Sequence, residues 1–169
     1  MIILDTVRLR LRHLVESDSA FVLRLLNEPS FIRNIGDRGV RTLADAVRYL
    51  RDGPIASYRT HGYGLYRVEI RESGVAIGIC GLVRRDYLEA ADVGFAFLPE
   101  FWARGYATES AMAVMAYAFR SLGQPRVLAI VSPSNAGSIR VLGKLGFVYQ
   151  GLIRPPGGGS EVQLYAADA

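Results

Sequence analysis

Residues 104–108, Arg-Gly-Tyr-Ala-Thr, are the stretch whose residue types and spacing most favour ligand chemistry. They follow a strand-like run ending at Leu98 and open an apolar run with helical spacing. The first backbone N–H groups of a helix lack partners within it, and the helix dipole favours negative charge there. Gly105 and Ala107 keep side chains out of the way. The stretch therefore predicts an anion-binding helix N-terminus, and a plain strand–helix turn with water at its N–H groups is the alternative.

The elements that must position this stretch follow from hydrophobic periodicity. Strands are predicted at 7–13, 64–72, 75–83, 91–98, 126–133, 147–153 and 161–166. Helices are predicted from a cap at Ser17 to Asn27, from Thr42 to Gly53-Pro54, over 107–122 and over 136–145. Tight turns between strands favour antiparallel pairing, and the strand–helix–strand unit over 91–132 adds a parallel neighbour. The pattern predicts a mixed sheet with helices on both faces.

The first predicted strand alternates apolar and basic residues. Val7, Leu9 and Leu11 should face the core, with Arg8, Arg10 and Arg12 facing out. Residues 31–41 lie between the first two helices and contain two glycines, so we expect a loop or a broken helix there. Cys80 lies between two glycines on an apolar strand and should be a small core residue.

The composition is that of an ordinary globular protein, and 169 residues suggest one domain with an adequate core. No apolar stretch is long enough to span a membrane, and a single cysteine fits a reducing cytoplasm. The net charge is +4, and all but one of the basic residues are arginine. These arginines are dispersed without interleaved aromatic residues, which argues against a nucleic-acid face.

Two segments together carry a family resemblance, DVGFAFLPEFWARGYATES at 92–110 and SPSNAGSIRVLGKLGF at 132–147. In this order and spacing, after the opening VRLRLRHLVESDS, they resemble the GNAT N-acetyltransferase superfamily, most closely its ribosomal-protein N-terminal acetyltransferase (RimJ/RimL-like) branch. The resemblance implies an α+β fold with a mixed, mostly antiparallel sheet of six to seven strands and helices on both faces. It also implies that residues 1–169 form a single acetyltransferase domain.

The resemblance implies acetyl-coenzyme A as cosubstrate, with no metal, and its pyrophosphate at the helix N-terminus. The family's six-residue cradle falls on 102–107, where Gly105 and Ala107 match and Trp102 departs from the usual Arg or Gln. Because backbone N–H groups would make the contacts, side-chain departures matter little. The residues expected to bind the phosphates are Arg104, Gly105, Tyr106, Ala107 and Thr108.

The family also implies contacts to the pantetheine arm, which enters beside a splayed strand. Here the arm would pair with the backbone around Phe95, Phe97 and Leu98, and an N–H there would donate to the thioester carbonyl. Asn135 is expected to bind the arm, and Ser138 lies one helical turn further on the same face. Asn135 is equally suited to a helix N-cap, so both roles stay open.

The same resemblance supplies candidate acid and base residues. Asp92 matches an acidic residue that often starts the Gly-containing strand, and it would accept the amine's proton, directly or through water. A strand-end surface carboxylate is the alternative for Asp92, and Glu161 is a second choice of base. Many relatives carry a Tyr where this chain has Leu142, so Ser138 is the substitute candidate for protonating the leaving thiolate.

These expectations describe an N-acetyltransferase that moves an acetyl group to a primary amine by direct attack in a ternary complex. A non-catalytic acyl-CoA-binding or regulatory module of the same fold is the alternative, and a nucleic-acid or ribosome-associated binding protein is a third. The acceptor would be a protein N-terminus or a small molecule, with Glu28 or Asp37 available to attract a cationic amine. Strand edges near the C-terminus leave a homodimer open.

Overall fold

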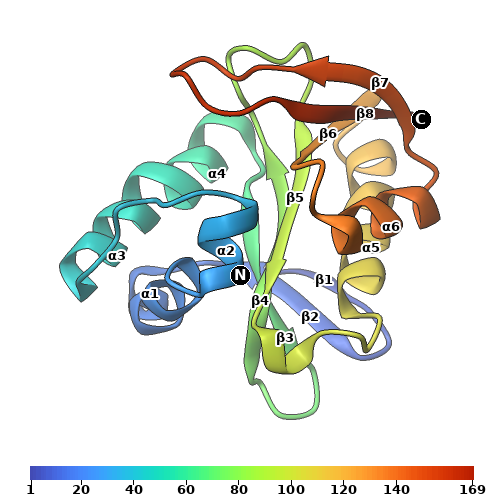
Figure 1. The fold of residues 1–169 in the computed structure, drawn as a ribbon. Helices are drawn as coiled ribbons and strands as arrows, with labels where there is room; N and C mark the ends of the chain where they lie inside the picture. Colours follow the sequence, from blue (N-terminus) through green and yellow to red (C-terminus); the bar gives the residue numbers. More distant parts are fainter.

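The computed structural model describes residues 1–169, and one mixed sheet organises them (Figure 1). The strands are β1 Ile2–Asp5, β2 Leu9–His13, β3 Leu65–Ile70, β4 Ala76–Val83, β5 Asp92–Phe97, β6 Arg126–Val131, β7 Val148–Ile153 and β8 Val162–Asp168. Their order is β1-β2-β3-β4-β5-β6-β8-β7, and every neighbouring pair is antiparallel except β5 and β6. The predicted α+β class is confirmed, and eight strands exceed the expected six to seven.

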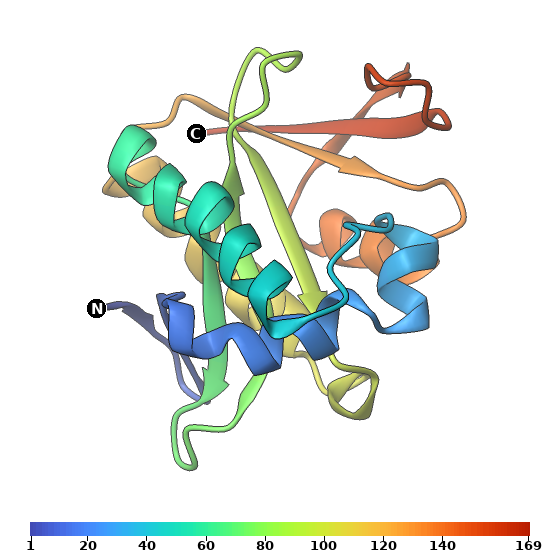
Figure 2. The ribbon, with the colours of Figure 1, turned by 90° about the vertical axis from the view of Figure 1, so that its left-hand side faces the viewer.

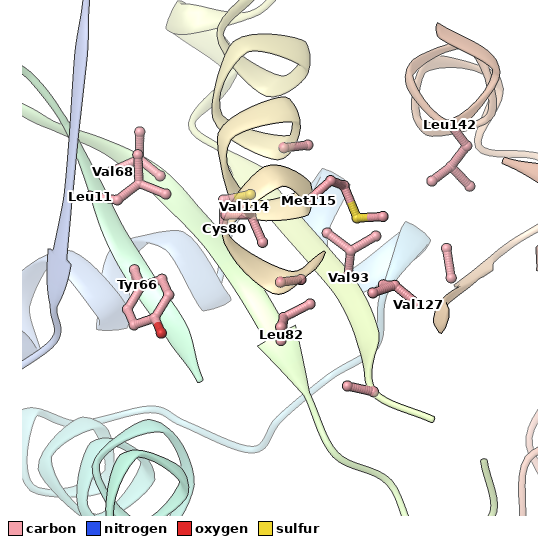
Figure 3. Packing of buried hydrophobic residues seen from close by; sticks show 14 of the residues in the cluster. Leu11, Tyr66, Val68, Cys80, Leu82, Val93, Val114, Met115, Val127 and Leu142 are labelled. Atoms are coloured by element: carbon pink, nitrogen blue, oxygen red, sulfur yellow. The ribbon is translucent and has the colours of Figure 1, made fainter. Parts of the chain in front are cut away.

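Helices cover both faces of the sheet, as the sequence predicted (Figures 1 and 2). The helices are α1 Ser19–Leu26, α2 Pro29–Asn34, α3 Leu43–Leu50, α4 Ala56–His61, α5 Tyr106–Arg120 and α6 Ala136–Lys144. On one face, Val114 and Met115 of α5 belong to a core that includes Cys80 (Figure 3). On the other face, α1 and α3 pack over Ile79 and Leu98. Cys80 is a core residue, as expected, and burial raises the pKa of its thiol to about 12.

The N-terminal strand is shorter than predicted and has a partner that the sequence did not indicate. Thr6 accepts a hydrogen bond from the Leu9 amide on its hydroxyl (3.0 Å), and its own amide donates to the Leu9 carbonyl (2.8 Å). This turn joins β1 to β2 in antiparallel register. Val7 therefore lies in the turn and is 91% exposed, so its predicted inward orientation is wrong. The alternation holds only from Leu9 onward.

Two helix predictions also need correction. The second predicted helix does not end at Gly53-Pro54, because a π-helical turn over Arg51–Ile55 connects α3 directly to α4. Proline lacks an N–H group, and a wider turn accommodates it within a continuous helical path. The region expected as a loop or broken helix contains the short helix α2, which has Pro29 in its first turn. By contrast, the predicted capping box between Thr42 and Asp45 is confirmed.

The feature that positions the site is the divergence of β5 from β6. Their parallel register has a single pair, Asp92 with Leu128, beside the bond from the Leu128 amide to the Ala91 carbonyl at 2.9 Å. Beyond this vertex β5 stays paired with β4 as far as Phe97. The edge of β5 that faces β6 is therefore left without a strand partner over most of its length.

Candidate functional site

A cavity of about 600 Å³ lies at the open end of the β5–β6 divergence. Segments distant in the sequence form its walls: the end of β5, the loop into α5, the start of α5, helix α6 and helix α2. In Figure 1, α2 and α6 lie on opposite sides of β5, and both contribute residues to the lining. The predicted site residues in its lining are Phe95, Phe97, Gly105, Tyr106, Ala107, Thr108, Asn135 and Ser138. The fold thus unites the two segments that carried the resemblance.

The backbone of β5 presents polar groups to this gap. The Leu98 amide donates to the Ile77 carbonyl (2.9 Å) on the β4 side, whereas the Ala91 carbonyl faces β6. Because successive residues of a strand alternate the side to which their N–H and C=O groups point, Phe95 and Phe97 turn these groups toward β6. Leu98 is buried and does not line the cavity, so its N–H is not available as the expected donor.

Trp102, the departure from the family cradle, makes a specific contact at this edge. Its indole Nε1 donates to the Phe97 carbonyl at 2.9 Å. The carbonyl belongs to the unpaired edge of β5, so the side chain occupies an acceptor that a strand partner would otherwise use. The cavity edge therefore retains the N–H of Phe97 and both backbone groups of Phe95 as hydrogen-bonding positions.

The start of α5 has the geometry of an anion cradle. Gly105 is the N-cap with φ of 80°, and no side chain caps the helix. The first intrahelical bond is from the Glu109 amide to the Gly105 carbonyl at 3.0 Å, which leaves the amides of Tyr106, Ala107 and Thr108 without helix partners. Arg104, a predicted ligand, does not line the cavity, and its guanidinium lies 5.8 Å from the Phe101 ring centre.

Arg8 and Glu109 hold this cradle from the N-terminal turn, and the sequence did not indicate their contact. Arg8 donates from Nε to Glu109 Oε2 (2.7 Å) and from its backbone amide to Oε1 (2.9 Å). Thr6 adds a hydroxyl bond to Oε1 at 2.7 Å, and Arg8 Nη1 donates to the Arg104 carbonyl at 2.9 Å. Burial opposes ionisation of Glu109, but the bonds from Thr6 and Arg8 hold its pKa below the ordinary value. Strand alternation predicted only that Arg8 faces outward.

Asn135 and Ser138 lie together at the start of α6. The Asn135 side-chain oxygen accepts a hydrogen bond from the Ser138 amide at 3.2 Å, so the N-cap role is confirmed. The Asn135 side-chain amide and the Ser138 hydroxyl make no hydrogen bond within the chain and border the cavity. Leu142, where many relatives carry Tyr, is buried in the core. Ser138 is therefore the hydroxyl of α6 that lines the cavity.

Asp92 lies apart from these residues. It is 1% exposed at the vertex of the divergence, and its Oδ1 accepts a hydrogen bond from Arg85 Nε at 3.0 Å. Burial raises the pKa of its carboxyl to about 6, against the effect of the Arg85 charge. It is not a surface strand-end carboxylate, and it does not line the cavity. Glu161 is exposed and pairs with Arg154 at 3.3 Å in the loop before β8.

Three cations of the cavity wall escaped the list of predicted ligands. Glu28 is the only carboxylate in the lining, and Arg33 of α2 and Arg140 and Lys144 of α6 are its cations. Glu28 was noted as a possible amine site, whereas the other candidate, Asp37, pairs with Arg41 at 2.6 Å and lies outside the lining. No sequence signal marked Arg33 and Arg140, because arginines occur throughout the chain, and the single lysine, Lys144, has no motif that indicates a ligand.

A helix N-terminus with unpaired amides beside a strand edge with unpaired backbone groups fits a long ligand that ends in a phosphate anion. The sequence profile of the acetyltransferase (GNAT) domain matches residues 8–148, and the chain belongs to this family. Acetyl-CoA-dependent acetyl transfer is general for the family. The unpaired amides at the start of α5 suit the phosphates of that cosubstrate.

Relatives from Bacillus subtilis (strain 168) match most of the chain. The uncharacterized N-acetyltransferase YoaA is 28% identical over 154 residues, covering 90% of this chain and 86% of YoaA. The uncharacterized protein YkkB is 30% identical over 155 residues, covering 89% of this chain and 88% of YkkB. These similarities agree with the family assignment.

Solved structures share the fold. An acetyltransferase from Agrobacterium tumefaciens str. C58 has a TM-score of 0.84 at 25% identity, covering 98% of this chain and 94% of that one. RimL, a ribosomal L7/L12 alpha-N-protein acetyltransferase in complex with coenzyme A, has a TM-score of 0.84 at 19% identity, covering 99% and 98% of the two chains. None of the helices combines the length and the hydropathy that a membrane-spanning segment needs.

Proposed function

We propose that this chain is an N-acetyltransferase of the RimJ/RimL-like branch that transfers the acetyl group of acetyl-CoA to a primary amine, with residues 1–169 acting as one acetyltransferase domain. The observation that carries the proposal is the single cavity that unites the α5 cradle, the open edge of β5 and the Asn135–Ser138 end of α6. Each of these walls offers hydrogen-bonding groups that the fold itself leaves unused. Together they suit the phosphate, amide and thioester parts of acetyl-CoA.

The binding roles follow from which groups are unused. The amides of Tyr106, Ala107 and Thr108 bind the pyrophosphate, since the helix dipole adds to their hydrogen bonds. The backbone of Phe95 and the N–H of Phe97 pair with the pantetheine arm in the manner of a strand. The side-chain amide of Asn135 donates to the same arm while its oxygen keeps the cap.

In the chemical step, acetyl-CoA supplies an activated acyl group, and the amine nitrogen forms a bond to its carbonyl carbon as the carbon–sulfur bond breaks. The N–H of Phe97 or Phe95 stabilises the developing oxyanion. Asp92 accepts the proton that leaves the amine, through water because its side chain does not reach the cavity lining. Ser138 donates a proton to the leaving thiolate. Alignment of the two substrates supplies much of the rate gain.

The acceptor approaches the wall that carries Glu28. The Glu28 carboxylate lies 3.7 Å from Arg24 Nε. Arg24 Nη2 donates to both carboxylate oxygens of Glu100, at 2.6 and 2.7 Å. Glu28 is thus the less engaged partner and suits the ammonium form of an incoming amine. Both acceptor classes occur among fold neighbours, since RimL is named for a ribosomal protein and a SpeG chimera for spermidine. We propose a cationic amine, either a protein N-terminus or a small amine.

The test is thiol release from acetyl-CoA in the presence of a panel of small amines and N-terminal peptides, beside thermal unfolding with and without CoA. Amine-dependent thiol release with a raised melting temperature supports the enzyme. Stabilisation by CoA with no thiol release from any amine would support the non-catalytic acyl-CoA-binding module instead. The absence of both effects would contradict any role for coenzyme A.

A further inference from the structure

Arg140 and Lys144 are distinguished from most basic residues of the chain by having no partner. Most arginines are held by carboxylates; examples are Arg12 with Asp18 at 2.9 Å and Arg51 with Glu16 at 2.5 Å. Arg140 and Lys144 form neither an ion pair nor a side-chain hydrogen bond in this structure, although both line the cavity. Arg33 of α2 is also unpaired in the lining but is the only cation of its helix, whereas α6 presents two free positive charges to the cavity.

The two side chains lie on one face of α6. Residues four apart in a helix are neighbours on its surface, so Arg140 and Lys144 are placed together. Ala136 and Gly137 also line the cavity and add no bulk beside them. A cation in the last turn of a helix interacts favourably with the helix dipole. This interaction explains a basic residue at position 144 but not at position 140. Two adjacent, unpaired cations facing one cavity repel each other until an anion lies between them.

The α5 cradle does not use these cations. Its donors are the backbone amides of residues 106–108, which belong to a different helix. A ligand with a single pyrophosphate would leave Arg140 and Lys144 without a role. Coenzyme A carries one further phosphate, on its ribose. That group is a dianion near neutral pH and attracts guanidinium and ammonium groups strongly.

We infer that Arg140 and Lys144 form a separate site for the ribose phosphate of coenzyme A, and that this chain therefore discriminates coenzyme A from dephospho-coenzyme A. The inference rests on the proposed function for the identity of the ligand. The backbone amides of the α5 cradle bind the pyrophosphate, and the side chains of Arg140 and Lys144 bind the ribose phosphate. Discrimination arises because dephospho-coenzyme A leaves both cations unneutralised.

The experiment is isothermal titration of CoA and dephospho-CoA into the wild type and the Arg140→Ala/Lys144→Ala double variant. In the wild type we expect CoA to bind roughly tenfold or more tightly than dephospho-CoA, and less so at high salt. In the double variant we expect the two affinities to become equal, with that for dephospho-CoA unchanged. Both residues are exposed, so their loss should not affect folding.

Two matched variants distinguish a direct contact between these side chains and the ribose phosphate from a general effect of the protein's positive charge. Arg33→Ala removes a cation that lines the same cavity from α2, and Arg120→Ala removes an unpaired cation outside it. Both should keep the preference for CoA. Equal wild-type affinity for the two ligands would overturn the inference, as would equal weakening of both ligands in the double variant or loss of the preference in Arg33→Ala. If neither ligand binds the wild type, the proposed function fails rather than the phosphate site alone.

Discussion

The side chains of Arg8 and Glu109 join the N-terminal turn to the first turn of α5, with Arg8 Nε 2.7 Å from Glu109 Oε2. The same guanidinium bonds the Arg104 carbonyl at 2.9 Å, so it fixes the loop directly before the cradle. The Glu109 carboxylate lies at the helix end that we propose binds phosphate, where its negative charge repels a bound anion. The hydrogen bonds that it accepts from Arg8 and Thr6 offset this repulsion.

Glu109→Gln should change the affinity for CoA in two opposite ways. Loss of the negative charge alone should strengthen binding of an anion at the helix N-terminus. Loss of the contact with Arg8 should weaken it, because the cradle is no longer held in shape. We expect the second effect to dominate, with the Kd for CoA rising roughly tenfold, comparable to one charge-assisted hydrogen bond. Titration calorimetry would decide, and tighter binding would refute the positioning role.

Gly105→Val should weaken CoA binding roughly tenfold or more, because the added Cβ would lie 3.3 Å from Arg8 Nη2 and disturb the guanidinium that holds the cradle amides in place. The φ of 80° at Gly105 also strains any other residue, so stability should fall by about 1 kcal/mol. Gly62→Val is the matched control, since Gly62 has φ of 79° at the end of α4, outside the cavity lining. Arg104→Ala should weaken binding less. Equal CoA affinity in Gly105→Val and Gly62→Val would show that the turn at Gly105 does not bind the phosphates.

Asn135→Ser separates capping from ligand binding. Serine caps a helix about as well as asparagine, so unfolding free energy should change by roughly 0.5 kcal/mol or less. The side-chain amide donor is lost, and the Kd for CoA should rise roughly fivefold. Unchanged affinity at unchanged stability would leave Asn135 as a cap only. Ser138→Ala complements this test, because it should lower kcat while leaving CoA affinity nearly constant.

Asp92 should impose a pH dependence on stability. Its folded pKa of about 6 lies above the ordinary value of 3.8, so its contribution is fully favourable below pH 3.8 and is lost as pH rises through 6. The loss is on the order of 3 kcal/mol by linkage. Denaturant unfolding of Asp92→Asn should therefore show its stability rising relative to wild type between pH 4 and 7. A constant difference over that range would contradict the raised pKa.

The same residue makes a kinetic prediction. If Asp92 is the base, kcat/KM for the amine should rise through pH 6 in the wild type as the carboxylate ionises. Asp92→Asn should remove this rise and lower the rate most above pH 6, without a change in CoA affinity. An unaltered pH–rate profile in the variant would remove Asp92 from the mechanism.

Glu28→Gln tests whether the Glu28 carboxylate binds the incoming amine. The KM for a cationic amine should rise roughly tenfold, since a charge-assisted contact is lost, whereas the KM for acetyl-CoA should not change. Glu100→Gln is the matched control, because Glu100 shares Arg24 with Glu28 but lies outside the cavity lining. The same rise in both variants would assign the effect to Arg24 rather than to the acceptor.

Features that depend on neighbouring residues could be predicted from the sequence alone. The fold class follows from period and turn residues, and the Thr42–Asp45 capping box follows from spacing alone. Gly105 and the Asn135 cap were likewise marked by residue type at a helix start. The family motif joined these local signals into one expected site before any contact was known.

Contacts between residues far apart in the sequence could be identified only from the folded structure. The Arg8–Glu109 contact spans about a hundred residues, and no local pattern encodes such a pairing. The same holds for the exclusion of Asp92 from the cavity, which reflects where β5 leaves β6. Arg140 and Lys144 resemble any exposed cations in sequence, and only their shared position on the cavity wall sets them apart. Side-chain partners are fixed by packing across the sheet, and the linear order of residues does not contain that information.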